Sequence, residues 1–474
     1  MRKVFYIFLL LFISNAIAAQ GYKITVTSQH KSGIAYLVYY MGSKLNIQDS
    51  VAVPNSGTFV FKGATKVQPG IYAVVFPGKR MQTDFLIDNA QLITIKVDTA
   101  NFEKTQITGS PANVLFQQYQ NFVAQKGKLL QAERNAYNQA TTKADSTLHE
   151  KKYAQYNNEL NDYRENIIKT KPKEMLSVLL SALKASPQLD KIPVTKQDSI
   201  DNYYYYKSHY WDGISFTDDR IIRTPFFLPK LESYYREVMP QQNDSIIKDI
   251  DYKLLLARTN KEMYKFLLNW FTDEYINPKY MGQDAIFVHL FDKYHSKGIS
   301  NWLNEKQQET ITRRAFMLMS NLVGEKAANL DFVDTAGKPT PLYGIDAPYT
   351  LLVFWDPTCG HCKEEIPKID SFYRANWQKK GLKIYAVLSE TDNLKTTWVN
   401  YINEHRIGDW INVYQTKAAK ELDEKEQRAT YKQLYDVIVT PTYYLLDKDK
   451  RIIAKKLSRE QINDFLEFKT NQKP

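Results

Sequence analysis

Two cysteines carry the clearest chemical signal in the sequence. Cys359 and Cys362 are the only cysteines among the 474 residues, and two residues separate them. A disulfide between them would close so short a loop that it would constrain little of the unfolded chain, so fold stabilisation is a poor explanation for the pair. Three-residue spacing on a helix brings both sulfurs to one face, within reach of each other. We therefore interpret the pair as a site of reversible thiol–disulfide exchange.

Two other interpretations of the pair are weaker. Half of a zinc site would need two further cysteine or histidine ligands at defined spacing, and the sequence holds no second pair. An inert buried pair would leave the short spacing unexplained. We expect neither a metal nor another cofactor.

The pair stands where a predicted strand, Tyr349 to Trp355, gives way to a predicted helix. Unsatisfied backbone N–H groups and the helix dipole stabilise a thiolate at such a helix N-terminus. Cys359 is therefore the predicted nucleophile, with a depressed pKa. Cys362, one turn later, is its predicted resolving partner.

Alternating strands and helices surround the pair from about residue 326 onward. Strands are predicted at 349–355, 382–388, 410–414, 442–446 and 451–455, and helices at 362–377, 394–404, 424–435 and 459–467. This order implies a mixed α/β sheet with helices on both faces.

Two regions of different periodicity precede this domain. Residues 19–110 alternate apolar and polar positions between turn residues, which predicts an antiparallel β-sandwich or small barrel. Residues 111–325 change to a period of 3.6, which predicts an α-helical middle domain with a helical hairpin and long helices over 246–270 and 304–322. The remaining residues, 326–474, form the predicted C-terminal domain.

The N-terminus has the pattern of a cleavable signal peptide. Arg2 and Lys3 precede an apolar run that is too short to span a bilayer, and small residues end near Ala18. We expect removal of residues 1–18 and a soluble, exported protein, periplasmic in location, without a transmembrane anchor. The net charge of +11 is spread along the chain without a basic block, so we expect no nucleic-acid partner.

The C-terminal domain resembles the thioredoxin fold over about residues 326 to 470. The resemblance rests on Trp355 four residues before the first cysteine, on the pair itself, on Pro367 five residues after the second, and on Thr440-Pro441 ahead of a late strand. It implies a cis Pro441 that faces the pair and holds substrate backbone. We expect Trp355, His361 and Thr440 to contact the substrate.

An additional helix and strand, together with an opening hairpin, are similar to the exported TlpA/ResA-like branch of that family. This branch places an active-site glutamate at the position of Glu390, which would manage the proton on Cys362; a plain surface glutamate is the alternative. The branch also implies protein disulfide or dithiol substrates and electrons from a membrane thiol donor. The upstream regions resemble bacterial domains of unknown function.

These observations predict an exported thiol–disulfide oxidoreductase, with disulfide reduction as the leading direction. Val353 stands where thioredoxins have a buried aspartate, so that proton acceptor is missing. The Gly360-His361 dipeptide, as in protein disulfide isomerases, and Thr440 before the proline favour oxidase or isomerase work. A partner-binding protein with a subordinate redox module is the second hypothesis. A peroxidase is disfavoured, because Asp356 stands where peroxiredoxin-like sites keep a hydroxyl.

Overall fold

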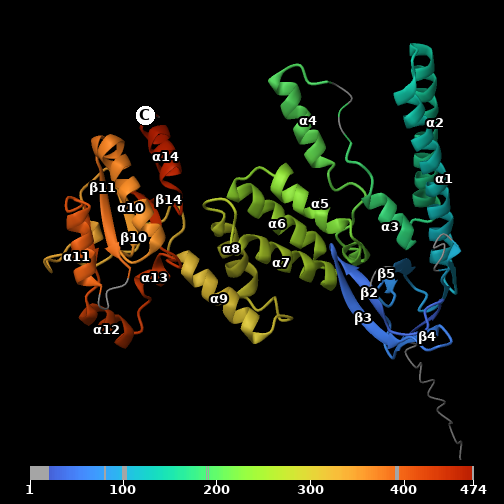
Figure 1. The fold of residues 1–474 in the computed structure, drawn as a ribbon, viewed down its shortest axis with the longest axis horizontal. Coiled ribbons are helices and arrows are strands. Elements are labelled where there is room, and N and C mark those ends of the chain that lie inside the picture. Colours follow the sequence, from blue (N-terminus) through green and yellow to red (C-terminus); the bar gives the residue numbers. More distant parts are fainter. Residues whose placement is uncertain are drawn as a thin grey trace, which may run out of the picture. The chain divides into compact units, whose positions relative to one another are not determined.

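The computed structural model describes residues 21–78, 82–98, 104–187, 189, 192–389 and 394–471. The predicted signal peptide and Glu390 therefore lie outside the described residues. The chain divides into two compact units, one of residues 1–240 and 255–266, the other of residues 241–254 and 267–474 (Figure 1). Within the described ranges, no helix is long and apolar enough to cross a membrane.

The first unit begins with a sandwich of two four-stranded sheets, in the orders β4-β1-β7-β8 and β3-β2-β5-β6. The strands are β1 (Tyr22–Thr27), β2 (Ile34–Met41), β3 (Lys44–Ala52), β4 (Thr58–Gly63), β5 (Gly70–Val75), β6 (Gln82–Ile87), β7 (Leu92–Lys96) and β8 (Gln106–Thr108). Alternate residues from both sheets, among them Ile24, Phe61 and Phe85, share one buried core. The predicted β-sandwich is confirmed.

One strand pairing differs from the predicted antiparallel arrangement. β1 and β7 run parallel, with Ile24 opposite Ile93 and Val26 opposite Ile95. Parallel neighbours need a long connection, and here the chain passes through the other sheet between the two strands.

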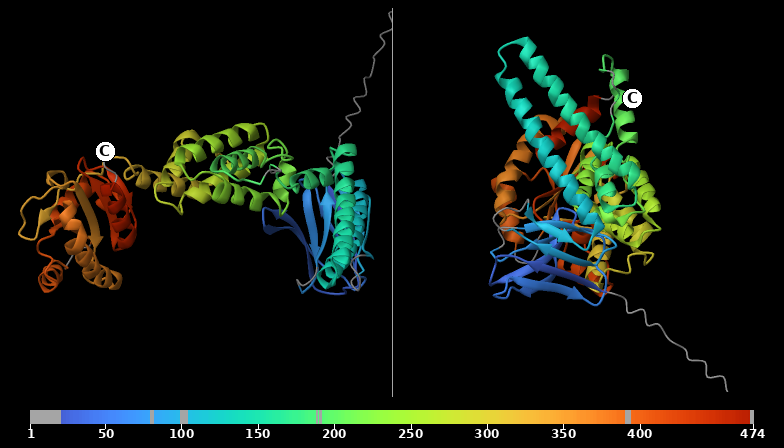
Figure 2. Two further views of the ribbon diagram at one scale, coloured as in Figure 1. Left: turned by 90° about the horizontal axis from the view of Figure 1, so that it is seen from above. Right: turned by 90° about the vertical axis from the view of Figure 1, so that its right-hand side faces the viewer.

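Helices complete the first unit, as the change of periodicity predicts. They are α1 (Pro111–Gln139), α2 (Lys143–Thr170), α3 (Met175–Ala182), α4 (Lys196–Ser208) and α5 (Phe227–Ser233). The Ser110 side chain caps α1 by accepting a hydrogen bond from the Asn113 N–H, and Pro111 occupies the first turn. α1 and α2 form the predicted hairpin beside the strands (Figure 2). The Tyr163 ring of α2 lies 4.3 Å from that of Phe122 on α1.

Four further helices lead toward the C-terminal domain: α6 (Asn243–Ala257), α7 (Lys261–Tyr275), α8 (Asp284–Leu290) and α9 (Glu305–Met319). The prediction of one helix over 246–270 is wrong, because the chain breaks after Ala257. The Asn260 side chain caps a new helix by accepting a hydrogen bond of 3.0 Å from the Met263 N–H.

The second unit contains a six-stranded sheet in the order β14-β13-β10-β11-β12-β9. Its strands are β9 (Val333–Asp334), β10 (Tyr349–Trp355), β11 (Leu382–Leu388), β12 (Ile411–Tyr414), β13 (Thr442–Asp447) and β14 (Ile452–Lys455). Central β10 pairs in parallel with β11 and antiparallel with β13, so the sheet is mixed as predicted.

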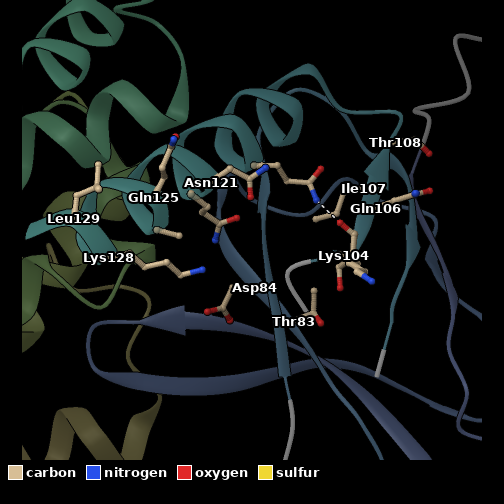
Figure 3. Close-up of a pocket in the computed structure, with 14 residues that line it drawn as sticks. Thr83, Asp84, Lys104, Gln106, Ile107, Thr108, Asn121, Gln125, Lys128 and Leu129 are labelled. Carbon is tan, nitrogen blue, oxygen red and sulfur yellow. Dashed lines mark hydrogen bonds between the residues drawn. The ribbon is translucent and has the colours of Figure 1, made fainter. Parts of the chain in front are cut away.

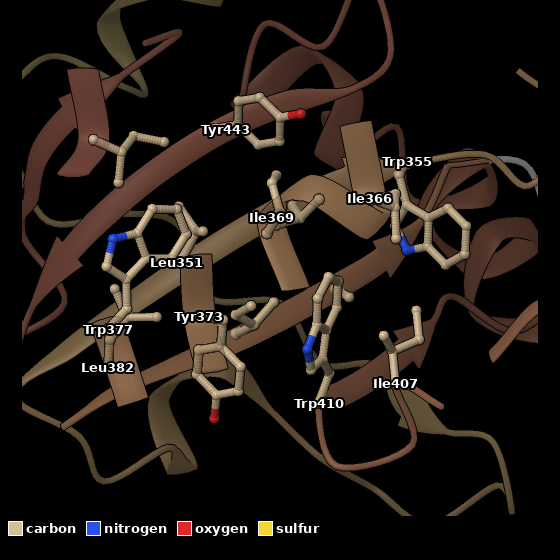
Figure 4. Packing of buried hydrophobic residues seen from close by; sticks show 14 of the residues in the cluster. Leu351, Trp355, Ile366, Ile369, Tyr373, Trp377, Leu382, Ile407, Trp410 and Tyr443 are labelled. Carbon is tan, nitrogen blue, oxygen red and sulfur yellow. The ribbon is translucent and has the colours of Figure 1, made fainter. Parts of the chain in front are cut away.

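Side chains of β10 alternate between two buried cores. Leu351, Val353 and Trp355 pack on the face covered by helices α10 (Gly360–Phe372), α11 (Lys395–Glu404) and α14 (Arg459–Asn471). Leu352 and Phe354 pack on the other face, against residues of the segment 327–342 and of α13 (Tyr431–Leu434). Figure 4 shows the first of these cores, with large aromatic and aliphatic side chains filling the space beside the strands.

Two helix predictions in this domain need correction. The predicted helix 424–435 is wrong in its bounds: α12 (Lys417–Lys425) precedes it almost entirely, and only α13 lies inside it, where Thr430 and Gln433 form a capping box that starts this short helix. The predicted helix 362–377 starts earlier, at Gly360, and its last turn, Tyr373–Trp377, is a π-helix.

Candidate active site

The loop after β10 presents Cys359 at the start of α10. Cys359 is the N-cap residue, with φ −72° and ψ 125°. The Asp356 carboxylate shapes this loop by accepting hydrogen bonds from the N–H and the hydroxyl of Thr358, both at 2.6 Å. The Cys359 N–H donates to the Asp356 carbonyl oxygen at 3.2 Å. The turn therefore holds the Cys359 sulfur at the open end of the helix, where it is partly exposed.

Cys362 lies one turn later and is fully buried. It belongs to the core between β10 and α10, among Trp355, Ile366 and Tyr443. The Asp356 N–H points at its sulfur from 3.5 Å. Both cysteines are free thiols, one open to a partner molecule and the other closed to it.

The two thiols differ in acidity as well as in exposure. Burial alone would raise the pKa of Cys359, but hydrogen-bonding groups of Thr440, of Cys362 and of the first helical turn outweigh burial and lower this pKa below its usual value of 9.0. Burial raises the pKa of Cys362 to about 12. Near neutral pH, Cys359 is therefore the better nucleophile of the two, and Cys362 stays protonated.

The segment before β13 forms the opposite wall of the site. The Thr440–Pro441 peptide bond is cis, as the resemblance implies. The Cys359 thiol donates a hydrogen bond of 3.4 Å to the Thr440 carbonyl oxygen, so residues 81 positions apart meet here. Immediately before them, Ile438 and Val439 are 68% and 69% exposed, which is unusual for side chains of this kind.

The remaining predicted site residues have different positions. His361 is exposed, beside Cys359 in the first turn of α10. Trp355 has no exposed surface and packs against the Tyr401 ring at 5.2 Å, so the structure places it in the core rather than on a surface that a substrate touches. Glu390 is not among the described residues. Within those residues, no group of three or more histidine, cysteine or acidic side chains could hold a metal ion.

Two tyrosines near Cys362 were not singled out by the sequence patterns. Tyr401 on α11 and Tyr443 on β13 are buried, and neither hydroxyl has a hydrogen-bond partner among the described residues. Burial raises the pKa of both hydroxyls, and the charge that Cys362 would carry raises it further. Only the inward alternation of β13 and the apolar stripe of α11 could have indicated them, and these patterns do not distinguish a site residue from an ordinary core residue.

Comparison with known proteins divides the chain into three matched regions. Residues 22–116 match a domain of unknown function (DUF4369), and residues 130–321 match another (DUF5106). Residues 323–455 match the AhpC/TSA family.

Among curated proteins, thiol-disulfide oxidoreductase ResA of Bacillus thuringiensis is 25% identical over 147 residues, which are 30% of this chain and 76% of that protein. Among solved structures, a domain of a possible thiol-disulfide isomerase from Cytophaga hutchinsonii is 37% identical, covering 32% of this chain and 94% of that one with a TM-score of 0.28. A thioredoxin-like protein from Bacteroides caccae is 21% identical, covering 60% and 99% with a TM-score of 0.45. The chain therefore carries, over residues 323–455, a thioredoxin-like domain of the AhpC/TSA family whose relatives are ResA-like thiol–disulfide oxidoreductases.

Proposed function

We propose that this protein is an exported protein-disulfide reductase that uses Cys359 as nucleophile and Cys362 as resolving thiol. The observation that carries the proposal is the asymmetry of the pair: an accessible thiol with a lowered pKa beside a buried thiol with a pKa of about 12. Such asymmetry separates the two roles, because a partner can reach only one sulfur.

The reaction has two exchange steps. The Cys359 thiolate attacks one sulfur of a substrate disulfide, and the other substrate sulfur leaves as a thiolate. Cys362 then loses its proton and attacks the Cys359 sulfur, which releases the second substrate thiol and leaves a Cys359–Cys362 disulfide. Two electrons have passed to the substrate, so an external dithiol, for which we propose a membrane thiol donor, must reduce the pair again.

Substrate binding is proposed to use the segment before β13. A chain lying across this segment would meet the Thr440 and Pro441 backbone beside the Cys359 sulfur, and the exposed Ile438 and Val439 would cover its apolar side chains. Exposed His361 on the other side of Cys359 would contact the same chain. These contacts suit a polypeptide better than a small disulfide.

Export is proposed from the pattern of residues 1–18, and a role for Glu390 in moving the Cys362 proton is proposed from its position after β11. N-terminal sequencing of protein recovered from a cell envelope fraction tests export. The rate of the second exchange step in a Glu390→Gln variant tests the role of Glu390.

The function is tested by trapping. A Cys362→Ser variant should accumulate mixed disulfides on Cys359 that thiol reagents release, because the resolving step is blocked. The Cys359→Ser variant is the matched control and should trap little, since Cys362 is buried. Equal trapping by both variants, or by neither, would contradict the assigned roles. The direction follows from the reduction potential of the pair: about −270 mV indicates a reductase, and about −120 to −180 mV indicates an oxidase or isomerase.

A further inference from the structure

A buried ion pair holds the residue that immediately precedes segment 437–441, the part of the chain that faces Cys359. The Arg314 guanidinium on α9 donates a hydrogen bond of 2.6 Å to the Asp436 carboxylate, although the two residues are 122 positions apart. The Asp436 side chain has no exposed surface, and that of Arg314 is 15% exposed. Because a carboxylate buried so deeply needs opposite charge close by, this contact fixes where Asp436 lies.

Further contacts hold Asp436 from other sides. Its backbone is left-handed, with φ 46°, which aspartate tolerates better than most residues and which ends α13. The Lys456 ammonium, just after β14, pairs with the second carboxylate oxygen. The Asp436 N–H donates to the Gln433 carbonyl oxygen at 3.3 Å, and the Val437 N–H donates to that of Lys432 at 2.8 Å. The backbone and the side chain of Asp436 are therefore both fixed.

The helices before the domain supply a second contact of the same kind. The Asn321 side chain, just after α9, is fully buried and donates a hydrogen bond of 3.0 Å to the Leu434 carbonyl oxygen. Arg314 is itself oriented by a bond of 3.2 Å from its Nε to the Ile276 carbonyl oxygen, just after α7. The guanidinium therefore connects the end of α7 with the start of segment 437–441.

The segment itself is fixed mainly at its two ends. At its far end, the hydroxyl of Thr442, the first residue of β13, donates a hydrogen bond of 2.5 Å to the Val439 carbonyl oxygen. Between the ends, Ile438 and Val439 are mostly exposed, so packing contributes little to holding them. Thr440 follows, with its carbonyl oxygen 3.4 Å from the Cys359 sulfur. A shift of Asp436 would therefore move the wall of the cysteine site.

The ion pair joins two regions that match different families. Arg314 and Asn321 belong to the region that matches DUF5106, and Asp436 belongs to the region that matches the AhpC/TSA family. The curated relative ResA matches only 30% of this chain. The helical region, which contains no cysteine, thus contributes to the geometry of the cysteine site.

We propose that Arg314 is a positioning residue for disulfide exchange, which holds segment 437–441 in place beside Cys359 through its ion pair with Asp436. A segment that is already ordered binds a substrate chain without the entropy loss of ordering it first. Without the ion pair, the segment would sample other positions, and substrate binding would weaken. The effect on the reaction rests on the proposed function, whereas the placement of the segment does not.

The test measures insulin reduction by the whole chain, with dithiothreitol as the electron source. Arg314→Gln should raise KM for insulin at least about fivefold and lower kcat less than about twofold, because substrate binding is weakened and both cysteines remain. Arg374→Gln is the matched control in the same domain. Arg374 also pairs with carboxylates, those of Asp370 and Asp409, and its partners lie on α10 and just before β12. This control should keep both constants.

A double variant tests whether Arg314 acts through Asp436. Asp436→Asn retains a side chain that tolerates the left-handed backbone, and it should also raise KM. Arg314→Gln/Asp436→Asn should raise KM no more than Asp436→Asn alone, because the two residues contribute one shared interaction. Effects that multiply in the double variant, an unchanged KM in Arg314→Gln, or an equal rise in Arg374→Gln would overturn the proposal.

Hydrogen exchange separates this proposal from the proposed function, because it requires no turnover. The Asp436 and Val437 N–H groups are hydrogen-bonded, and in Arg314→Gln they should exchange at least about tenfold faster while the amides of β10 keep their rates. If the unchanged protein does not reduce insulin, the proposed function fails and the exchange pattern alone decides. Equal rates at Asp436 and Val437 in Arg314→Gln and Arg374→Gln, or faster exchange throughout β10 as well, would overturn the positioning role.

Discussion

Lys455 on β14 and Asp284 at the start of α8 form an ion pair inside the second unit, with each side chain only 5% exposed. The Lys455 ammonium also donates hydrogen bonds of 2.7 Å to the carbonyl oxygen and to the side-chain oxygen of Asn321, just after α9. Three acceptors thus surround one buried cation. This cluster fastens the edge of the thioredoxin-like sheet to the helices that precede the domain in sequence.

Removal of one partner from this pair should be costly. Asp284→Ala leaves the Lys455 charge buried without its counter-ion, and we expect a loss of about 3–5 kcal/mol in the free energy of unfolding, measured with urea. The exposed pair Lys417–Glu421, 3.9 Å apart with side chains 81% and 63% exposed, is the control. Glu421→Ala should change stability by less than about 1 kcal/mol. Equal losses in the two variants would show that the buried pair contributes nothing special.

Alkylation should distinguish the two cysteines by their pH profiles. Iodoacetamide reacts with thiolates, so the fully reduced protein should be modified first at Cys359, with a midpoint below pH 9.0 because its pKa is lowered. Cys362 should remain unmodified throughout this range, because burial raises its pKa to about 12 and closes it to the reagent. Peptide mass spectrometry identifies the modified residue at each pH. Modification of Cys362 before Cys359 would reverse the roles assigned here.

The unpartnered tyrosine hydroxyls beside Cys362 should be dispensable for stability. Tyr443→Phe removes a buried hydroxyl that forms no hydrogen bond among the described residues, so we expect an unchanged or higher free energy of unfolding. Tyr431→Phe is the matched variant, because that hydroxyl donates to the Ser389 carbonyl oxygen at 2.8 Å. Its removal takes away the hydrogen bond that this buried carbonyl oxygen accepts and should cost about 1–3 kcal/mol. If Tyr443→Phe costs as much as Tyr431→Phe, the Tyr443 hydroxyl has a partner after all.

Local patterns predicted the elements around the cysteine pair well. The strands 349–355 and 382–388 have the predicted bounds, because both are mostly apolar runs, interrupted only by Thr350 and Lys383, as buried parallel strands are. The cis Pro441 came from the resemblance rather than from the residues themselves. Trp355, for which we predicted a substrate contact, alternates with Leu351 and Val353 along the strand, so the sequence already indicates that its side chain enters the same core.

Contacts between distant residues could not be predicted from one sequence. The ion pair of Lys455 with Asp284 joins residues 171 positions apart, and nothing near either residue indicates the other. The parallel pairing of β1 with β7 could not be predicted either. A strand with one buried face shows the same alternation of apolar and polar residues whether its neighbour runs parallel or antiparallel to it. The groove of about 1070 Å³ that α1 forms with β6 and β8 in the first unit (Figure 3) likewise requires that these elements be placed together.

Acid should destabilise the second unit through one buried histidine. His295 lies between the hydroxyls of Thr272 and Ser300, each 2.8 Å from a ring nitrogen, and burial lowers its pKa from 6.5 to about 4. The folded state therefore binds this proton less readily than the unfolded state, so the stabilisation is complete above pH 6.5 and is lost as the pH falls toward 4. At about 1.4 kcal/mol per pH unit, the loss over this window is about 3 kcal/mol. Urea unfolding at several pH values should show this slope in the unchanged protein and a shallower one in His295→Gln, whereas a variant of the exposed His361, His361→Gln, should keep the full slope. Identical slopes in all three proteins would mean that His295 is protonated as easily in the folded chain as in the unfolded one.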